Sequence, residues 1–190
     1  SSIATLSEYI GDVRTAQAFK QKSELRANAI RKYFWDEQSG YFSDYHFAKA
    51  STTSQFSAAG MAPLFFNIAT PEQAKFAADF LKKNLLQPGG IVSTTRDTGQ
   101  QWDYPNGWAP QQWMAIQGLR NYQNFQLAEE ITSRWLTVTS KVYRDTGKMM
   151  EKYNVVDLSL TAGGGEYPTQ DGFGWTNGVT LALMSLSSQN

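Results

Sequence analysis

Two kinds of apolar segment alternate along the chain. The first kind has apolar residues at three-and-four spacing with charged residues between them, and it covers 12–35, 71–86 and 126–147. The second kind is almost free of charge and covers 53–69, 107–122 and 174–188. An amphipathic stripe predicts a helix with one wetted face, whereas an uncharged helix is expected to be buried on most sides. Three alternations therefore predict three pairs of inner and outer helices in an all-α fold.

Punctuating residues set the expected bounds of these helices. Thr70, Pro71 and Gln73 suit the N-cap, the first helical position and the capping box of the helix over 71–86. Pro63 is expected to kink the segment 53–69 or to mark its early turn. Gly40 predicts a turn between two short strands in DEQSGYFSDY.

The unusual residues cluster in three loops, each just before an uncharged segment. These loops read YFSDYHFAKASTT, TTRDTGQQWDYPNGW and, across 151–175, EKYN followed by GGGEYPTQDGFGW. Loops at one end of a ring of helix pairs converge, and function concentrates on loops. Aromatic rings in glycine-rich loops are typical of sugar sites, where flat rings stack on pyranose faces. The pattern predicts a site at this end of the fold.

Composition removes several classes of function. Seventeen basic and seventeen acidic residues give a formal net charge of 0 without a basic cluster, which argues against nucleic-acid and membrane-surface partners. No apolar run approaches the length of a membrane span. The chain has no Cys and one histidine, His46, so thiol chemistry is excluded and a zinc site is not expected. His46 is expected to be a packed or hydrogen-bonded structural residue.

Carboxylates in the aromatic and glycine-rich loops are the remaining candidates for chemistry. They are Asp44, Asp97, Asp103, Glu151, Asp157, Glu166 and Asp171. Glycoside hydrolysis needs two carboxyl groups and neither a metal nor a histidine. These features leave open a sugar-acting enzyme and a non-catalytic helical domain. Glu151 follows an outer helix, and an acid near a helix C-terminus is disfavoured by the dipole, so the segment 148–153 allows a short extended stretch that points Glu151 inward. Composition alone favours instead a surface residue paired with Lys148 or Lys152.

Longer motifs resemble a known family. QWDYPNGWAPQQWMAIQGL, 101–119, resembles the signature of the trehalases, an inverting family that cleaves the α,α-1,1 bond of trehalose. GGGEYPTQDGFGWTNGV, 163–179, and KMMEKYN, 148–154, are similar to two further segments of that family, most closely of its bacterial members. FWDEQSGYFSDY, 34–45, resembles a turn shared by six-hairpin toroid glycosidases. The resemblance implies that residues 1–190 form the C-terminal part of a catalytic domain, half of an (α/α)6 toroid.

The resemblance also implies roles for particular residues. Glu151 corresponds to the general base that activates water, which overrides the surface interpretation. Glu166 is implied to contact the substrate and Trp108 to line the sugar pocket. Trp102, Asp103 and Phe173 lie in the same motifs and are implied to belong to the substrate site. No cofactor and no metal are implied.

One expected element is missing. The family's general acid lies in a glycine-tryptophan-aspartate-x-serine motif, which the 190 residues do not contain, and its substrate-gripping arginines also lie upstream. The implied enzyme hydrolyses trehalose to two glucose molecules with inversion, and this chain alone is expected to be inactive. It is expected to pair with the missing N-terminal half or with itself. The alternatives are a non-catalytic sugar-binding or structural fragment, and a different toroid α-glucosidase. No signal peptide is visible, and the family resemblance leaves periplasm and cytoplasm open with a preference for periplasm.

Overall fold

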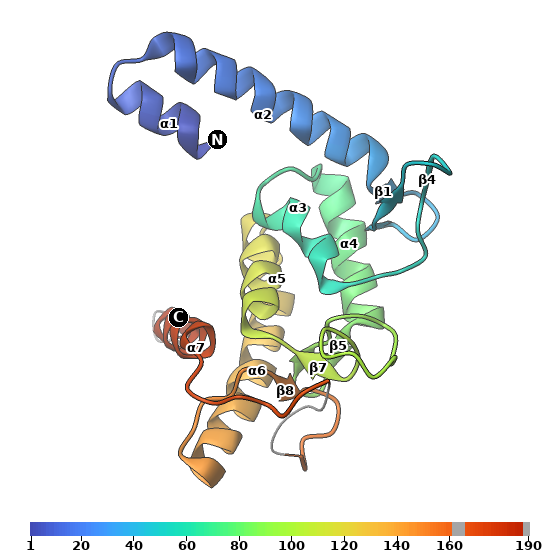
Figure 1. The fold of residues 1–190 in the computed structure, drawn as a ribbon, viewed down its shortest axis with the longest axis vertical. Coiled ribbons are helices and arrows are strands. Elements are labelled where there is room, and N and C mark those ends of the chain that lie inside the picture. The colour runs from blue at the N-terminus through green and yellow to red at the C-terminus, as the bar shows by residue number, and fades with distance from the viewer. Residues whose placement is uncertain (161–165, 188–190) are drawn as a thin grey trace.

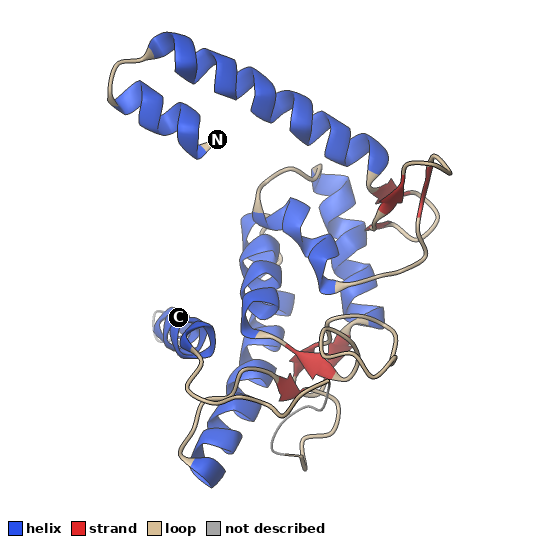
Figure 2. Cartoon of the chain, viewed as in Figure 1, coloured by secondary structure: helices blue, strands red, loops and turns tan. Residues whose placement is uncertain are grey.

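The computed structural model describes residues 1–160 and 166–187, which form helices joined by short antiparallel strand pairs (Figure 1, Figure 2). The helical elements are α1 (Ser2–Tyr9), α2 (Val13–Tyr33), η1 (Ala58–Met61), α3 (Ala62–Phe65), α4 (Pro71–Asn84), α5 (Ala109–Asn121), α6 (Phe125–Thr146) and α7 (Gly174–Ser187). The strand pairs are β1 (Trp35–Asp36) with β2 (Tyr41–Phe42), β3 (Tyr45–His46) with β4 (Ser51–Thr52), β5 (Leu86–Gln87) with β6 (Gly90–Ile91), and β7 (Asn106–Gly107) with β8 (Tyr153–Asn154). The all-α prediction is confirmed.

The uncharged helices pack against one another, although α7 is not buried on most sides as predicted, because Leu181 is 68% and Met184 is 47% exposed. Helix α5 contacts α3 and α7, its uncharged neighbours, as well as the charged helix α6 (Figure 1). Gly118 permits the close approach of α3 to α5, because a Cβ there would stand 3.0 Å from Leu64 Cβ and 3.0 Å from the Phe65 nitrogen. The alternation in the sequence therefore corresponds to an inner and an outer layer.

The bounds of the outer helices α2, α4 and α6 lie within two residues of the predicted 12–35, 71–86 and 126–147. Thr70 and Gln73 form the capping box of α4, with the Gln73 N–H donating to Thr70 Oγ1 at 3.1 Å and the Thr70 N–H to Gln73 Oε1 at 3.0 Å. Helix α6 ends at Gly147, which has φ 71°, the left-handed conformation that glycine adopts without strain. Between its ends, α6 buries Ile131, Trp135 and other residues at three-and-four spacing.

The prediction of one helix over 53–69 is wrong. Only η1 and α3 are helical there, and the residues before them are bound in other ways. Ser57 bridges Thr94, Tyr41 Oη donates to the Ser57 carbonyl at 3.0 Å, and the Ala58 N–H donates to the Ser93 carbonyl at 2.9 Å. The backbone groups of this segment therefore pair with the loop before α5 and with Tyr41, and not within a helix. Pro63 marks the early turn of α3, one of the two outcomes expected for it.

The N-terminal hairpin of α1 and α2 differs most from expectation. Helix α1 was not predicted, and the hairpin projects away from the body formed by α3 to α7 (Figure 1). The apolar face of α2 was expected to be covered, but Val13 is 61% and Leu25 is 70% exposed. The C-terminal end of α2 is anchored by Arg31, whose Nη1 donates to the Ile68 carbonyl at 2.7 Å. Along the rest of α2, the described chain leaves much of the apolar stripe uncovered.

Candidate active site

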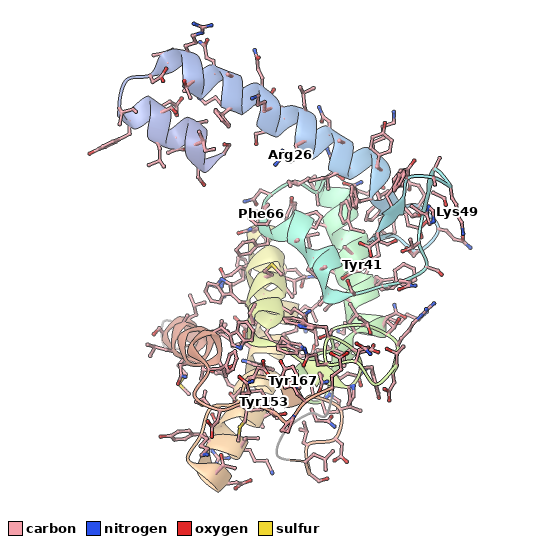
Figure 3. The ribbon with its side chains drawn as sticks, in the orientation of Figure 1. Arg26, Tyr41, Lys49, Phe66, Tyr153 and Tyr167 are labelled. Atoms are coloured by element: carbon pink, nitrogen blue, oxygen red, sulfur yellow. The ribbon has the colours of Figure 1, made fainter. Side chains whose placement is uncertain are left out.

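Backbone pairing brings three loop segments together at one end of the inner helices. Strand β7, which precedes α5, pairs with β8 so that Gly107 lies opposite Tyr153. The segment before β8 also pairs with the loop before α7: the Glu151 N–H donates to the Gln170 carbonyl at 2.8 Å, and the Gly172 N–H to the Met149 carbonyl at 2.8 Å. Figure 3 places Tyr153 and Tyr167 in this region, at the end of the molecule away from the α1–α2 hairpin. The second and third of the predicted loops are therefore gathered here, and the first, 41–53, takes no part in these pairings.

Glu151 lies at the centre of this junction and is 4% exposed. Its main chain is fixed on both sides, because the Glu151 carbonyl accepts a hydrogen bond from Trp175 Nε1 at 3.0 Å. Tyr167 Oη donates to Glu151 Oε1 at 2.7 Å, and Lys152 Nζ donates to Glu151 Oε2 at 3.3 Å. The surface position that composition favoured is wrong, although the pairing with Lys152 that accompanied it is present.

Four aromatic rings form a cluster that is joined to Glu151 through Trp175. Trp102 stacks on Trp108 with ring centroids 3.7 Å apart and planes 6° from parallel, and Trp175 meets both rings edge-on. Phe173 packs on Trp175 with centroids 4.8 Å apart. Trp108 is buried and its Nε1 donates to the Gln101 carbonyl at 3.2 Å, whereas Trp102 is 46% exposed. Trp102 therefore offers an aromatic surface to a ligand and Trp108 supports it from behind.

Asp103 has a different environment from Glu151. Its carboxylate accepts hydrogen bonds from the Thr94 hydroxyl, from the Thr98 N–H at 2.6 Å and from the Tyr104 N–H at 2.9 Å. Burial on its own raises the pKa of Asp103, but these hydrogen bonds outweigh it and hold the pKa below its ordinary value. A carboxylate held ionised in this way organises the loop before α5 and is poorly suited to donate a proton.

Glu166 lies at the margin of the site. Its side chain is exposed, and its charge is one of the causes that raise the pKa of the neighbouring Tyr167 phenol, the largest being the hydrogen bond to Glu151. Gly163, Gly164 and Gly165, which precede Glu166 in the motif, lie outside the described residues. The implied substrate contact of Glu166 stays a prediction.

Three of the other candidate carboxylates serve local structure, and Asp44 lines the cavity described below. Asp171 forms an exposed ion pair with Lys148, Asp157 accepts from the Ser159 N–H at 2.9 Å, and Asp97 accepts from the Gly99 N–H at 3.3 Å. His46 is exposed, and its Nδ1 accepts a hydrogen bond from the Lys49 N–H at 3.3 Å. Of the two roles expected for it, packed or hydrogen-bonded, it has the second. Across 1–160 and 166–187, no three such side chains gather where they could hold a metal ion.

A polar cavity adjoins the tryptophan stack. Its volume is about 460 Å³, and it lies between the loop before α5 and the segment before η1. Its lining consists of Asp44, Gln55, Phe56, Ser57, Thr94, Arg96, Thr98, Gln100, Trp102 and Asp103. One exposed ring with hydroxyl, amide and charged groups around it can stack on a sugar face and bind its hydroxyls. Larger cavities of about 630 and 600 Å³ lie along α6 and between α4 and α5, away from Glu151.

Sequence reasoning placed Glu151 with Trp102, Trp108 and Phe173, but it considered Lys152 only as a surface partner of Glu151 and gave no role to Tyr167. Lys152 is fully buried and touches both Glu151 and the aromatic rings. A lysine beside a predicted inward-pointing glutamate is the sequence signal that could have identified it. Tyr167 follows the exposed Glu166 and gave no comparable signal, because its contact with Glu151 crosses 16 positions of chain.

Alternating inner and outer helices, with a buried carboxylate beside tryptophans at the loop end, define the catalytic-domain class of the toroid glycoside hydrolases. Residues 1–188 match the family described as Trehalase, and the chain belongs to that family. Neutral trehalase Nth1 from Saccharomyces cerevisiae is 33% identical, with a TM-score of 0.76 over 90% of this chain and 30% of that chain. The fold is half of an (α/α)6 toroid.

A second solved structure shares the fold. The GH63 mannosylglycerate hydrolase from Thermus thermophilus, in complex with glucose, is 19% identical, with a TM-score of 0.69 over 96% of this chain and 43% of that chain. The chain thus spans less than half the length of either structure. In the described part of the chain, no helix is both long and apolar enough to cross a membrane.

Proposed function

We propose that this chain forms the C-terminal part of a trehalase catalytic domain, residues 1–190, and that Glu151 is the general base of an inverting hydrolysis of trehalose to two glucose molecules. The observation that carries the proposal is the environment of Glu151, a buried carboxylate with two hydrogen-bonding partners. One of these partners, Lys152, has its Nζ 5.5 Å from the Trp108 ring centroid, and Trp102, which stacks on Trp108, lines the cavity. The family membership and the 33% identity to a yeast trehalase support the choice of sugar.

In the proposed mechanism, Glu151 takes a proton from a water molecule as that water attacks the anomeric carbon of one glucose unit. A carboxylic acid on the opposite face protonates the glycosidic oxygen, so the bond to the second glucose breaks and configuration inverts. The two carboxyl groups stand roughly 6.5–9.5 Å apart to admit the water. The general acid is supplied by chain upstream of these residues. Trp102 and Phe173 hold the sugar rings, Trp108 supports the Trp102 ring from behind, and Glu166 binds hydroxyls.

The same proposal assigns a role to the uncovered apolar surface. Ile10, Val13 and Leu25 on the N-terminal hairpin and Leu181 on α7 are largely exposed. Apolar patches of this kind mark interaction surfaces. The occupant proposed here is the remaining half of the catalytic domain, which would complete the ring and bring the general acid opposite Glu151. In its absence, a second copy of this chain is expected to cover the surface.

The test is glucose release from trehalose by the chain alone and after mixing with a separately made upstream half of the catalytic domain. Activity restored by mixing and abolished by Glu151→Gln supports the proposal. Glu72→Gln, which removes an exposed carboxylate from the first turn of α4, is the matched control and is expected to leave activity unchanged. Full activity in the isolated chain would refute the claim that the acid lies elsewhere.

A second substrate separates the two carboxyl roles. Fluoride leaves without protonation, so α-glucosyl fluoride needs a general base but no general acid. Mixtures whose upstream half lacks its acid are expected to hydrolyse α-glucosyl fluoride while failing on trehalose, and Glu151→Gln is expected to remove both activities. Faster hydrolysis of maltose or another α-glucoside would favour a different toroid glucosidase, and binding of glucose without hydrolysis in the mixture would favour a sugar-binding fragment.

A further inference from the structure

We propose that Lys152 and Tyr167 are positioning residues that hold Glu151 ionised and oriented for proton transfer. The inference deepens the proposed function and rests on it for its catalytic meaning. It concerns two residues with no role in the mechanism above, and it starts from the surroundings of a buried cation.

Lys152 is 0% exposed, which is rare for a lysine because burial strips the ammonium group of its water. Three groups compensate the charge. Glu151 Oε2 lies 3.3 Å from Nζ, the Tyr167 ring centroid lies 4.4 Å away, and the Trp108 ring centroid lies 5.5 Å away. Ring faces attract cations through their quadrupole. A fully buried Nζ does not reach a ligand in the cavity, so Lys152 acts through Glu151.

Tyr167 connects the two charges. Its hydroxyl donates to Glu151 Oε1 at 2.7 Å while its ring covers Lys152 Nζ. The hydrogen bond to Glu151 raises the pKa of the Tyr167 phenol, because loss of the proton would remove the bond and set two negative charges together. Tyr167 therefore keeps its proton and remains a donor throughout the working range of pH.

Both partners leave Glu151 able to act as a base. A carboxylate has about four lone-pair positions, so one partner on each oxygen leaves positions for a water molecule. The cation stabilises the ionised form, and removing it would leave a buried carboxylate with one partner fewer. Without Lys152, Glu151 is expected to take up a proton at a higher pH and to lose its function as a base there.

Other charges near Glu151 do not replace Lys152. On the loop before α7, Tyr167 contacts it while the charge of the exposed Glu166 acts on the Tyr167 phenol, and the described part of α7 carries no charged residue. On the segment before β8, Lys148 is exposed and paired with Asp171. On the loop before α5, Asp103 is occupied by hydrogen bonds from Thr94, Thr98 and Tyr104. Among the described residues around this carboxylate, Lys152 is the one buried cation.

The direct test needs no substrate. The chain is labelled with carboxyl-¹³C glutamate, the Glu151 signal is assigned by its loss in Glu151→Gln, and its pH titration is followed by NMR. Lys152→Met is expected to move the titration of that signal to higher pH, because the buried carboxylate loses the cation beside it. Lys148→Met, which removes an exposed lysine four positions earlier, is the matched control and is expected to leave it in place. Equal titrations in both variants would overturn the proposal.

A second variant separates charge from packing. The chain has no native cysteine, so Lys152→Cys can be alkylated selectively while unfolded and then refolded. Bromoethylamine restores an ammonium group of nearly the length of lysine, and propyl iodide gives a neutral group of the same shape. The aminoethyl chain is expected to titrate as wild type and the propyl chain as Lys152→Met. Identical titrations of the two alkylated chains would show that the charge is irrelevant and would refute the inference.

Measurements of trehalose hydrolysis test whether Lys152 and Tyr167 matter for catalysis. In the enzyme completed by the upstream half, kcat/KM is measured against pH. In Lys152→Met, the acidic limb of this profile is expected to move to higher pH by the same interval as the NMR titration of Glu151. Tyr167→Phe, which keeps the ring and removes the donor, is expected to move it by less. An NMR difference without trehalose hydrolysis in the completed wild type would refute the proposed function and leave the pairing intact. Hydrolysis that depends on Glu151, with an unmoved acidic limb in Lys152→Met, would refute the positioning role alone.

Discussion

The pairing of β7 with β8 positions the site, and Gly107 is the residue on which that pairing depends most visibly. A Cβ at this position would stand 2.5 Å from Val155 Cγ1 and 2.9 Å from the Ile91 carbonyl oxygen. That oxygen is held in place, because Gln112 Nε2 donates to it at 2.7 Å while Gln112 Oε1 accepts from the Ile91 N–H at 2.9 Å. Gly107→Ala therefore forces a main-chain shift beside the site.

The expected loss can be estimated. An added methyl group in a packed interior destabilises by about 1–3 kcal/mol. A loss of about 2 kcal/mol in a chain of this size lowers Tm by roughly 4–8 °C. Urea unfolding followed by tryptophan fluorescence and thermal unfolding followed by circular dichroism measure the two quantities. Gly178→Ala is the matched control, because a Cβ there meets nothing within 4 Å. Alanine within a helix is expected to increase the free energy of unfolding by at most about 1 kcal/mol.

A double variant tests the assigned cause. Val155→Ala removes the nearest obstacle and on its own is expected to cost about 2 kcal/mol through lost burial. Because the clash with Cγ1 is then absent, Gly107→Ala and Val155→Ala together should cost less than the sum of the two, by at least about 0.5 kcal/mol. A Gly107→Ala chain as stable as wild type, or strictly additive losses, would refute the reasoning.

Two further predictions follow from the loop carboxylate and from the uncovered hairpin. Because hydrogen bonds hold the pKa of Asp103 below its ordinary value of 3.8, the ionised residue stabilises the fold above that pH and the contribution disappears as the pH falls through the lowered value. Asp103→Asn should therefore lower Tm by a few degrees at pH 6 and make Tm fall less steeply as the pH is lowered into the acid range. An unchanged dependence of Tm on pH in the acid range would contradict this. Leu25→Glu should weaken self-association in sedimentation velocity, whereas Gln21→Glu, which adds the same charge to α2, should not. Equal effects of the two would indicate charge repulsion instead of an apolar interface.

Local signals in the sequence determined most of the helices. The capping residues Thr70 and Gln73 and the stop at Gly147 act within a single turn, so their effect can be read without knowledge of distant contacts. The alternation of charged and uncharged segments predicted the two layers, because each layer exposes a different share of its surface to water. The prediction of a helix over 53–69 was wrong because backbone groups of this segment pair with the loop before α5 and with Tyr41. No local sequence pattern records these distant contacts.

For the site, the sequence by itself determined that Glu151 and three aromatic residues belong to motifs resembling those of one family. The tertiary structure decided which groups act on that carboxylate. Composition assigned Glu151 to the surface, yet the pairing of β8 with β7 and of Met149 and Glu151 with the loop before α7 buries it. Tyr167 reaches Glu151 across 16 positions, and Lys152 is enclosed by rings from two different loops. A hydrogen bond or a cation–π contact depends on distances of a few ångströms, and those distances are set when remote segments pack together.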